Sequence, residues 1–159
     1  MPTVDATKGG PNANTYMDDI DSLEFIDEFY GADEWALLSE DDRERLLITA
    51  TRMIDRLNIV YDKADAAQAL KFPVKNTQDA ADDGWEAVKE AVMLQAMYLM
   101  ANHDAIQEAQ NISIQGVKSE SLSSVSKTTT GFNTFRRWHP DVLKVLAKYI
   151  NLEFKTYRG

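Results

Sequence analysis

The sequence predicts a mainly α-helical fold: a small bundle of about four helices, a protruding β-hairpin between the third and last helices, and extended N- and C-terminal arms. Two stretches with apolar residues at helical spacing, 39–57 and 85–102, predict the body of the bundle. A Ser- and Thr-rich stretch at about 112–128 breaks that period and predicts the hairpin. A chain of 159 residues can bury one core, so a single domain is expected.

The ends of the chain differ from its centre in composition. Residues 1–13 are rich in Gly, Pro and Asn without a regular apolar period, which predicts a flexible N-terminal arm. Residues 14–151 carry the periodic segments and are predicted to form the helical domain. Residues 152–159 follow the last apolar stripe and are predicted to be a C-terminal tail.

The first predicted helix is short. Asp18 is its expected N-cap and Gly31 its expected stop. Its apolar residues at helical spacing predict one buried stripe: Ile20, Leu23, Ile26 and Tyr30. The apolar residues that follow are expected to plug the space under the next connection: Trp35, Leu37 and Leu38.

The second predicted helix has the clearest pattern in the chain. Ser39 followed by Asp42 matches the signature of an N-cap with an acid three residues later. The positions expected to face inward are Leu46, Leu47, Ala50, Met53, Ile54 and Leu57, and those expected to face outward are Arg43, Glu44, Arg52 and Asp55.

The third predicted helix is apolar on most of its circumference. A helical turn or two is expected earlier, around 64–70, and ends before Phe72-Pro73 because a proline disfavours helix in the preceding residue. Asp83 with Glu86 then predicts the cap of the long helix. Two apolar stripes predict a central helix that contacts neighbours on several sides. One stripe is Trp85, Val88, Val92, Ala96 and Leu99, and the other is Ala91, Leu94, Met97 and Tyr98.

The hairpin and the last helix complete the predicted fold. The 112–128 stretch has little apolar mass and cannot be stable without a neighbour. His139-Pro140 is the expected start of the last helix, because proline suits the first helical position. Its inward stripe is expected to be Val142, Leu143, Leu146, Tyr149 and Ile150.

Charge is unevenly distributed along the chain. The net charge of −9 disfavours general binding to phosphate backbones, which depends on Lys and Arg. Residues 1–45 carry a net charge of −10, whereas residues 116–159 carry +5. This asymmetry either steers one chain onto an oppositely charged partner or reflects two solvated faces, and both interpretations stay open.

Motifs for catalysis or metal binding are absent from the sequence. The chain has no cysteine and only two separated histidines, and the run Asp18, Asp19, Asp21 lacks the glycine and distal glutamate of a calcium loop. The acids look uniformly solvent-exposed, unlike a catalytic carboxylate pair. We therefore expect no enzyme activity, cofactor or metal. No signal peptide or membrane-spanning run is visible, so no membrane association is expected.

One basic and aromatic cluster precedes the last helix. Arg136, Arg137 and Trp138 could stack on the bases of a single strand, or they could form the hot spot of a protein interface. Because the chain as a whole is acidic, the sequence favours a protein contact over nucleic acid.

Four short motifs follow one another along the chain: Asn-Thr-Tyr at 14–16, Ala-Thr-x-x-Ile-Asp-x-Leu at 50–57, Gln-Ala-Leu-x-Phe-Pro at 68–73 and Val-Lys-Ser-Glu at 117–120. In this order they resemble the head-to-tail adaptor, or connector, proteins of tailed bacteriophages over about residues 14–150. Some members of that group carry the label of DnaT-like single-stranded DNA-binding proteins.

The resemblance implies a structural virion protein, present in the host cytoplasm during assembly and in the neck of the virion. Copies would form a dodecameric ring beneath the portal protein, continue the DNA channel, and dock a tail-side neck protein such as a stopper or tail terminator. Genomic DNA would pass without sequence-specific binding. Acids expected near such a lumen, because they repel phosphate, are Asp18, Asp19, Asp21, Glu24, Asp27 and Glu28.

Two further contacts follow from the resemblance. The hairpin would pair with neighbouring subunits or the next ring through Ile114, Val117, Lys118, Leu122 and Val125. The residues expected to dock on the portal or another partner are Phe154, Tyr157, Arg158, Arg136, Arg137 and Trp138. The alternatives are a DnaT-like single-stranded DNA-binding replication protein and a monomeric acidic inhibitor that mimics nucleic acid.

Overall fold

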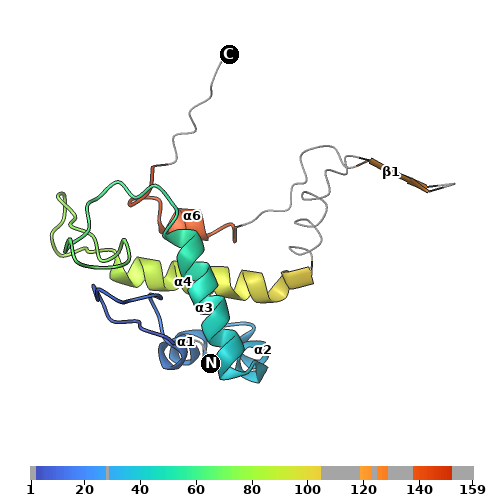
Figure 1. Cartoon of the computed structure of the whole chain (residues 1–159), viewed down its shortest axis with the longest axis horizontal. Coiled ribbons are helices and arrows are strands. Elements are labelled where there is room, and N and C mark those ends of the chain that lie inside the picture. The colour runs from blue at the N-terminus through green and yellow to red at the C-terminus, as the bar shows by residue number, and fades with distance from the viewer. Residues whose placement is uncertain (1–2, 28, 105–118, 123–124, 129–137, 152–159) are drawn as a thin grey trace, which may run out of the picture.

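The computed structural model describes residues 3–27, 29–104, 119–122, 125–128 and 138–151. Their helices are α1 (Asp19–Ile26), α2 (Ala32–Leu37), α3 (Glu40–Ile54), α4 (Trp85–Ala101) and α6 (Val142–Val145) (Figure 1). The two strands are β1 (Ser119–Leu122) and β2 (Val125–Thr128). The fold is mainly α-helical, as the sequence predicts.

The long helix α4 is the centre of the domain, as its two apolar stripes predict. α3 packs against it along one side and α6 along another, whereas α1 and α2 lie beside the N-terminal half of α3 (Figure 1). Six of the α4 side chains are buried apolar residues of the core: Val88, Ala91, Val92, Met93, Ala96 and Leu99. The largest ring at the α1–α2 end is the fully buried Trp35.

β1 and β2 form an antiparallel pair in which Leu122 lies opposite Val125 and Ser119 opposite Thr128. These eight residues are the described part of the segment predicted as a hairpin. They are too few to alter a mainly helical class. Three of the residues expected to make its contacts, Ile114, Val117 and Lys118, lie outside the described residues.

Several predicted helix boundaries are confirmed by capping contacts. The Asp18 carboxylate accepts a hydrogen bond from the Asp21 amide at 2.8 Å, which satisfies one of the free donors at the start of α1. Ser39 Oγ accepts from the Asp42 amide at 3.2 Å in the same way at α3. At α4 the N-cap is Gly84 rather than Asp83, although Asp83 Oδ1 still accepts from the Trp85 amide at 3.0 Å.

The first predicted helix is wrong at its C-terminal end. α1 ends at Ile26, and Gly31, expected as its stop, is instead the N-cap of the separate helix α2 with φ 101°. Two members of the predicted buried stripe are exposed: Ile20 at 68% and Tyr30 at 99%. Leu37, expected in the buried plug, is 86% exposed, whereas Trp35 is buried as expected. The described residues therefore contain five helices, not about four.

Two other predicted elements differ. Residues 64–70 form turns instead of a helix, held by the Gln68 side chain, whose Nε2 donates to the carbonyls of Leu70 and Pro73. α6 begins at Val142 rather than at Pro140 and lasts only one turn. Of the predicted inward stripe, Val142, Leu146, Tyr149 and Ile150 are buried, and Leu143 is only partly buried.

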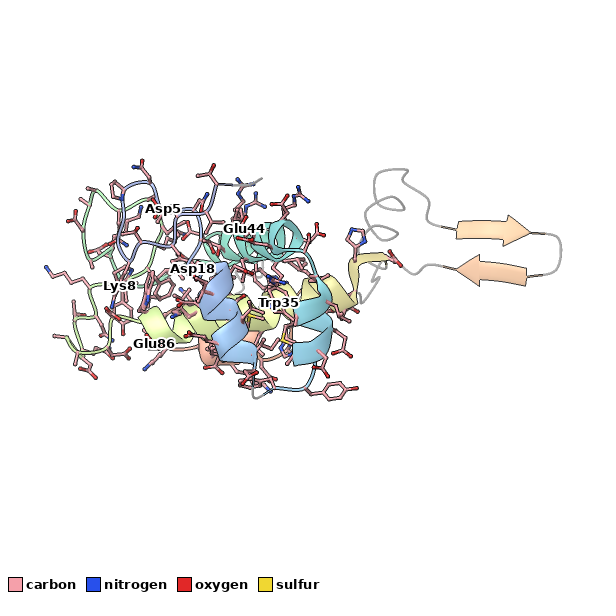
Figure 2. The ribbon with its side chains drawn as sticks, turned by 90° about the horizontal axis from the view of Figure 1, so that it is seen from below. Asp5, Lys8, Asp18, Trp35, Glu44 and Glu86 are labelled. Carbon is pink, nitrogen blue, oxygen red and sulfur yellow. The ribbon has the colours of Figure 1, made fainter. Side chains whose placement is uncertain are left out.

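The segment predicted as a flexible arm makes described contacts with the helical domain. The Gly10 carbonyl accepts a hydrogen bond from the Ala69 amide at 3.0 Å. Lys8 Nζ lies 2.6 Å from Asp83 Oδ2 and 5.5 Å from the centre of the Trp85 ring. Figure 2 shows Lys8 and Glu86 at the same end of the molecule.

Candidate functional site

Two adjoining hollows open at the C-terminal end of α4. One, of about 490 Å³, lies between α3 and α4, and the other, of about 520 Å³, lies between α2 and α4. They share Leu38 and Met100, so we describe them together as the α2–α4 groove. Its apolar lining is Leu38, Leu46, Met97, Leu99, Met100 and Tyr30. Its polar rim is Glu34, Asp42, Arg45, Thr49 and His103.

Local sequence explains why this groove stays open. α2 is only six residues long, and it starts at Gly31, whose positive φ turns the chain so that Trp35 enters the core. On so short a helix Leu37 falls on the solvent side, while Leu38 is extended at the C-cap and faces the groove. A Cβ on Gly31 would come within 2.9 Å of Met97 Cε, so this backbone approaches α4 closely.

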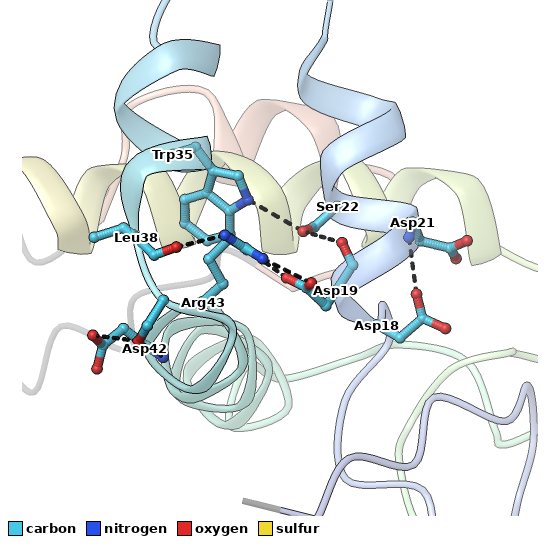
Figure 3. A network of polar contacts seen from close by, with 9 residues as sticks. Asp18, Asp19, Asp21, Ser22, Trp35, Leu38, Asp42 and Arg43 are labelled. Atoms are coloured by element: carbon cyan, nitrogen blue, oxygen red, sulfur yellow. Dashed lines mark hydrogen bonds and ion pairs between the residues drawn. The ribbon is translucent and has the colours of Figure 1, made fainter. Parts of the chain in front are cut away.

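A network of polar contacts joins α1, α2 and α3 beside the groove (Figure 3). Trp35 Nε1 donates to Ser22 Oγ at 3.2 Å, and Ser22 Oγ donates to the Asp19 carbonyl at 2.7 Å. Arg43 donates to both oxygens of the Asp19 carboxylate and, through Nη1, to the Leu38 carbonyl at 2.6 Å. Burial therefore leaves none of these groups without a partner.

Three charged residues are less exposed than the sequence predicts. Arg43 was expected to face outward, but its side chain is only 10% exposed; hydrogen bonds to Asp19 raise its pKa, against the effect of burial. Asp19 is only 15% exposed, so the acids are not uniformly solvent-exposed. Asp55, also expected outward, is partly buried and accepts from Tyr16 Oη at 2.6 Å. In each case a partner distant in sequence supplies the compensating contact.

The acids predicted to approach a lumen fall into two groups. Asp18 caps α1, Asp19 pairs with Arg43, and Asp21 pairs with Lys89 of α4 at 2.9 Å, so these three stabilise the fold. Glu24 and Asp27, towards the end of α1, are exposed and make no ion pair among the described residues. Glu28 lies outside the described residues.

Acidic side chains also crowd the start of α3. Glu40, Asp41 and Asp42 occupy its first turn, where the helix dipole favours negative charge. Arg45 lies 3.0 Å from Asp42 and 3.9 Å from Asp41 and offsets part of the charge. Burial and the neighbouring carboxylates of Glu40 and Asp41 raise the pKa of Glu44. This end of the groove is consequently a region of negative potential.

Of the predicted basic and aromatic cluster, only Trp138 is described. It is partly buried against the core, and the adjacent His139 amide donates to Gln95 Oε1 of α4 at 3.0 Å. His139 also meets the Tyr98 ring edge to face at 6.0 Å. Arg136, Arg137, Phe154, Tyr157 and Arg158 lie outside the described residues. Of the hairpin residues, Leu122 is the last residue of β1 and is paired with Val125, the first residue of β2.

The groove is the feature that sequence reasoning missed. The available signal was that three large apolar residues, Ile20, Tyr30 and Leu37, lie on or between two short helices that cannot bury them all. In the part of the chain that the structure describes, no group of three or more His, Asp or Glu side chains could hold a metal ion. Within the same residues, no helix is both long and apolar enough to cross a membrane.

These observations define a small, mainly helical domain with an acidic surface and an open apolar groove. The chain matches, over residues 3–159, the model of the family described as "Putative DnaT-like ssDNA binding protein", and it belongs to that family. No curated protein and no solved structure matches it.

Proposed function

We propose that this protein acts by assembly with other protein chains, as a head-to-tail adaptor that forms a ring beneath the portal of a tailed bacteriophage. The observation that carries this proposal is the open apolar groove on a strongly acidic body. Residues 1–104 contain 22 acidic and nine basic side chains, a net charge of −13. Such a body repels a phosphate backbone, whereas an unfilled apolar groove gains stability from a protein partner.

A ring around DNA also gives the exposed acids a use. A channel through which DNA slides functions best when its wall does not bind phosphate tightly. Glu24 and Asp27 are exposed and not committed to ion pairs among the described residues, so we propose these two as the lumen acids. Asp18, Asp19 and Asp21 hold the α1 end of the subunit in place.

The adaptor role is tested by mixing the full-length protein with the portal protein encoded in the same genome and imaging the product by electron microscopy. We expect a second ring attached to the portal. Deletion of residues 152–159, with Phe154, Tyr157 and Arg158, should abolish attachment and leave the melting temperature of the subunit unchanged. Attachment that survives the deletion contradicts a docking role for the tail, and absence of any attachment contradicts the adaptor role itself.

The hairpin is tested in the same system by deleting residues 113–128. If these residues only join rings, the subunit should keep its melting temperature and lose contact with the neighbouring ring. A large loss of thermal stability would instead place the segment in the fold of the subunit.

The second candidate function is single-stranded DNA binding, and the family's description favours it over the adaptor role. It would use the basic part of the chain, because residues 105–159 carry a net charge of +4 and include Arg136, Arg137 and Trp138. Arg and aromatic side chains are the groups that bind phosphates and stack on bases in single-strand binders.

A salt titration separates the two functions. Fluorescence anisotropy with a labelled oligo-dT, at about 50 mM and about 200 mM salt, should show tight, salt-sensitive binding if DNA is the ligand. The double variant Arg136→Glu, Arg137→Glu should then bind far more weakly. The matched control Arg52→Glu, Arg56→Glu changes the charge equally on exposed side chains of the acidic body and should have a much smaller effect. Weak binding by the unaltered protein favours the adaptor role.

A further inference from the structure

We infer that the α2–α4 groove binds residues 129–137 of a second copy of this chain. The inference rests on the proposed assembly function and names the contact by which one subunit holds the next. Its occupant has the sequence TTGFNTFRR. The evidence lies in the lining of the groove, its charge and its position relative to Trp138.

The groove has the lining of a peptide-binding surface. Met97 and Met100 supply flexible, polarisable side chains that adapt to an inserted ring. Tyr30, 99% exposed, stands at its edge, and Leu37, 86% exposed, lies on the same short helix α2. Phe132 and Phe135 of the proposed occupant are three residues apart and could fill the two adjoining hollows.

The charges of groove and occupant are complementary. Glu34 lines the groove, and Asp33 of α2 and Glu40 of α3 are exposed; none of the three forms an ion pair among the described residues, whereas Arg45 on the rim is paired with Asp41 and Asp42. The proposed occupant ends in Arg136 and Arg137, and no acidic residue occurs anywhere in 121–140. Arg side chains paired with carboxylates at a rim give an interface its register.

The position of Trp138 favours a second copy over the same chain. Residues 129–137 join the domain at Trp138 and His139, and the His139 amide is fixed to Gln95. Met97 and Met100 lie roughly 140–160° around the α4 axis from Gln95, at about 100° per residue. α6 and α2 accordingly lie on opposite sides of α4 (Figures 1 and 2). The chain thus carries the Met97 and Met100 part of the groove on the side of α4 away from the anchor of the segment, whereas Leu99, in the other hollow, lies about 40° from Gln95.

A subunit with a groove on one side and its ligand on the opposite side associates head to tail. This heterologous contact repeats from copy to copy and closes into a ring when the rotation between copies permits.

The test uses the full-length protein and a labelled synthetic peptide of residues 129–137, with binding followed by fluorescence anisotropy. The unaltered peptide should bind, and replacing Phe132 and Phe135 by Ser should abolish binding. Tyr30→Ala should weaken binding about tenfold, as for an aromatic hot-spot residue. Glu34→Lys should weaken peptide binding about fivefold. The Glu34→Lys protein should in turn bind a peptide with Arg136→Glu and Arg137→Glu better than it binds the unaltered peptide.

Glu86→Lys is the matched control, because Glu86 is exposed at the other end of α4 and the charge change is the same. It should leave peptide affinity within about twofold. No peptide binding, or equal weakening by Glu34→Lys and Glu86→Lys, overturns the inference. A second result also overturns it. If the full-length variant Arg136→Glu, Arg137→Glu binds the peptide more tightly than the unaltered protein does, and the gain is the same at every protein concentration, then the segment competes for the groove of its own chain.

The outcome is separable from that of the adaptor role. Rings that still form on the portal with Tyr30→Ala and Glu34→Lys would overturn the groove contact and leave the adaptor role standing. Peptide binding that responds to these variants, without any attachment to portal rings, would support the groove contact and remove the adaptor role.

Discussion

Arg43 of α3 holds Asp19 of α1 through two parallel hydrogen bonds: Nε donates to Oδ1 at 2.5 Å and Nη2 donates to Oδ2 at 2.9 Å. Both side chains are largely buried. The remaining nitrogen of the guanidinium donates to the carbonyl of Leu38, the C-cap of α2. One side chain therefore joins three helices beside Leu38, which lines the groove, and the planar shape of Arg is required to satisfy all three acceptors.

Replacing Arg43 by Met should destabilise the protein by about 3 kcal/mol, because the buried Asp19 carboxylate and the Leu38 carbonyl lose their donors. Urea unfolding followed by circular dichroism measures the change in unfolding free energy. Arg45→Met is the control: Arg45 is 61% exposed, and loss of its contacts with Asp41 and Asp42 should cost no more than about 0.5 kcal/mol. Similar losses for the two variants would contradict the buried role of Arg43.

Gly84→Ala should destabilise the protein by roughly 2–4 kcal/mol. Gly84 has φ 74°, which is unfavourable for an L side chain, and an added Cβ would lie 2.6 Å from Phe72 Cε1 and 3.1 Å from Tyr149 Cε1. Gly9→Ala isolates the first effect, since Gly9 has φ 67° but a Cβ there would be 3.8 Å from its nearest neighbour in Pro73. Thermal unfolding should show a smaller loss of unfolding free energy, about 1 kcal/mol, for Gly9→Ala. Equal losses for the two variants would mean that the Phe72 and Tyr149 rings move aside without cost.

The helices that the sequence predicts best are those whose apolar pattern is long. α3 and α4 extend over 15 and 17 residues, so their buried faces repeat often enough to define the period. Their core residues Leu47, Ile54 and Val92 are all fully buried, as predicted. Tertiary packing and local pattern agree in these two helices.

Short helices defeat the same argument. Ile20 and Tyr30 fit one helical stripe with Ile26 only if a single helix continues to Gly31, but the chain turns after α1 and begins α2. That turn lets Trp35 enter the core, and burial of a whole indole outweighs exposure of smaller apolar groups. A stripe of four apolar residues does not show whether those residues or the nearby Trp35 will be buried.

The candidate groove was not predictable because it depends on contacts between distant residues. Arg43 and Asp19 are 24 positions apart, and both looked like solvent-exposed charges in the sequence. Met97, placed in an apolar stripe by its helical spacing, packs partly against the core, and it also lines the groove with Met100 because α2 is too short to cover them. By contrast, the charge asymmetry that motivates the assembly hypothesis is visible in the sequence itself.

Tyr16→Phe should lower the unfolding free energy by about 1–3 kcal/mol without disturbing the fold. The fully buried Tyr16 hydroxyl donates to Asp55 at 2.6 Å and accepts from the amides of Lys71 at 3.1 Å and Phe72 at 3.2 Å. Burial and the nearby Asp55 carboxylate raise the pKa of Tyr16, which therefore stays protonated and able to donate. Removal of the oxygen takes away the acceptor of the Phe72 amide, whereas the Lys71 amide keeps Asp55 Oδ1 at 2.8 Å.

Urea unfolding at neutral pH measures the effect of Tyr16→Phe, and Tyr61→Phe is its control. Tyr61 is only partly buried, and its ring meets Tyr149 edge to face at 6.3 Å, a contact that phenylalanine can keep. The control should change the unfolding free energy by less than about 0.5 kcal/mol. An unchanged stability of Tyr16→Phe would show that water replaces the hydroxyl.

Asp82→Asn should reduce the melting temperature at neutral pH, and the difference from the unaltered protein should close in acid. Asp82 accepts hydrogen bonds from Lys148 and Tyr149, which lower its pKa below the ordinary value of 3.8 and tie the turn after α6 to the loop before α4. Because the folded-state pKa is depressed, this stabilisation is complete above the unfolded-state pKa and is lost as pH falls through the folded-state value. Differential scanning calorimetry between about pH 7 and about pH 2.5 should therefore show a difference in melting temperature that begins to shrink as the pH falls below about 4. Asp62→Asn, which removes the same charge from an exposed side chain, should leave the melting temperature nearly unchanged throughout. A difference between Asp82→Asn and the unaltered protein that persists at the lowest pH would mean that the Asp82 contacts do not depend on its charge.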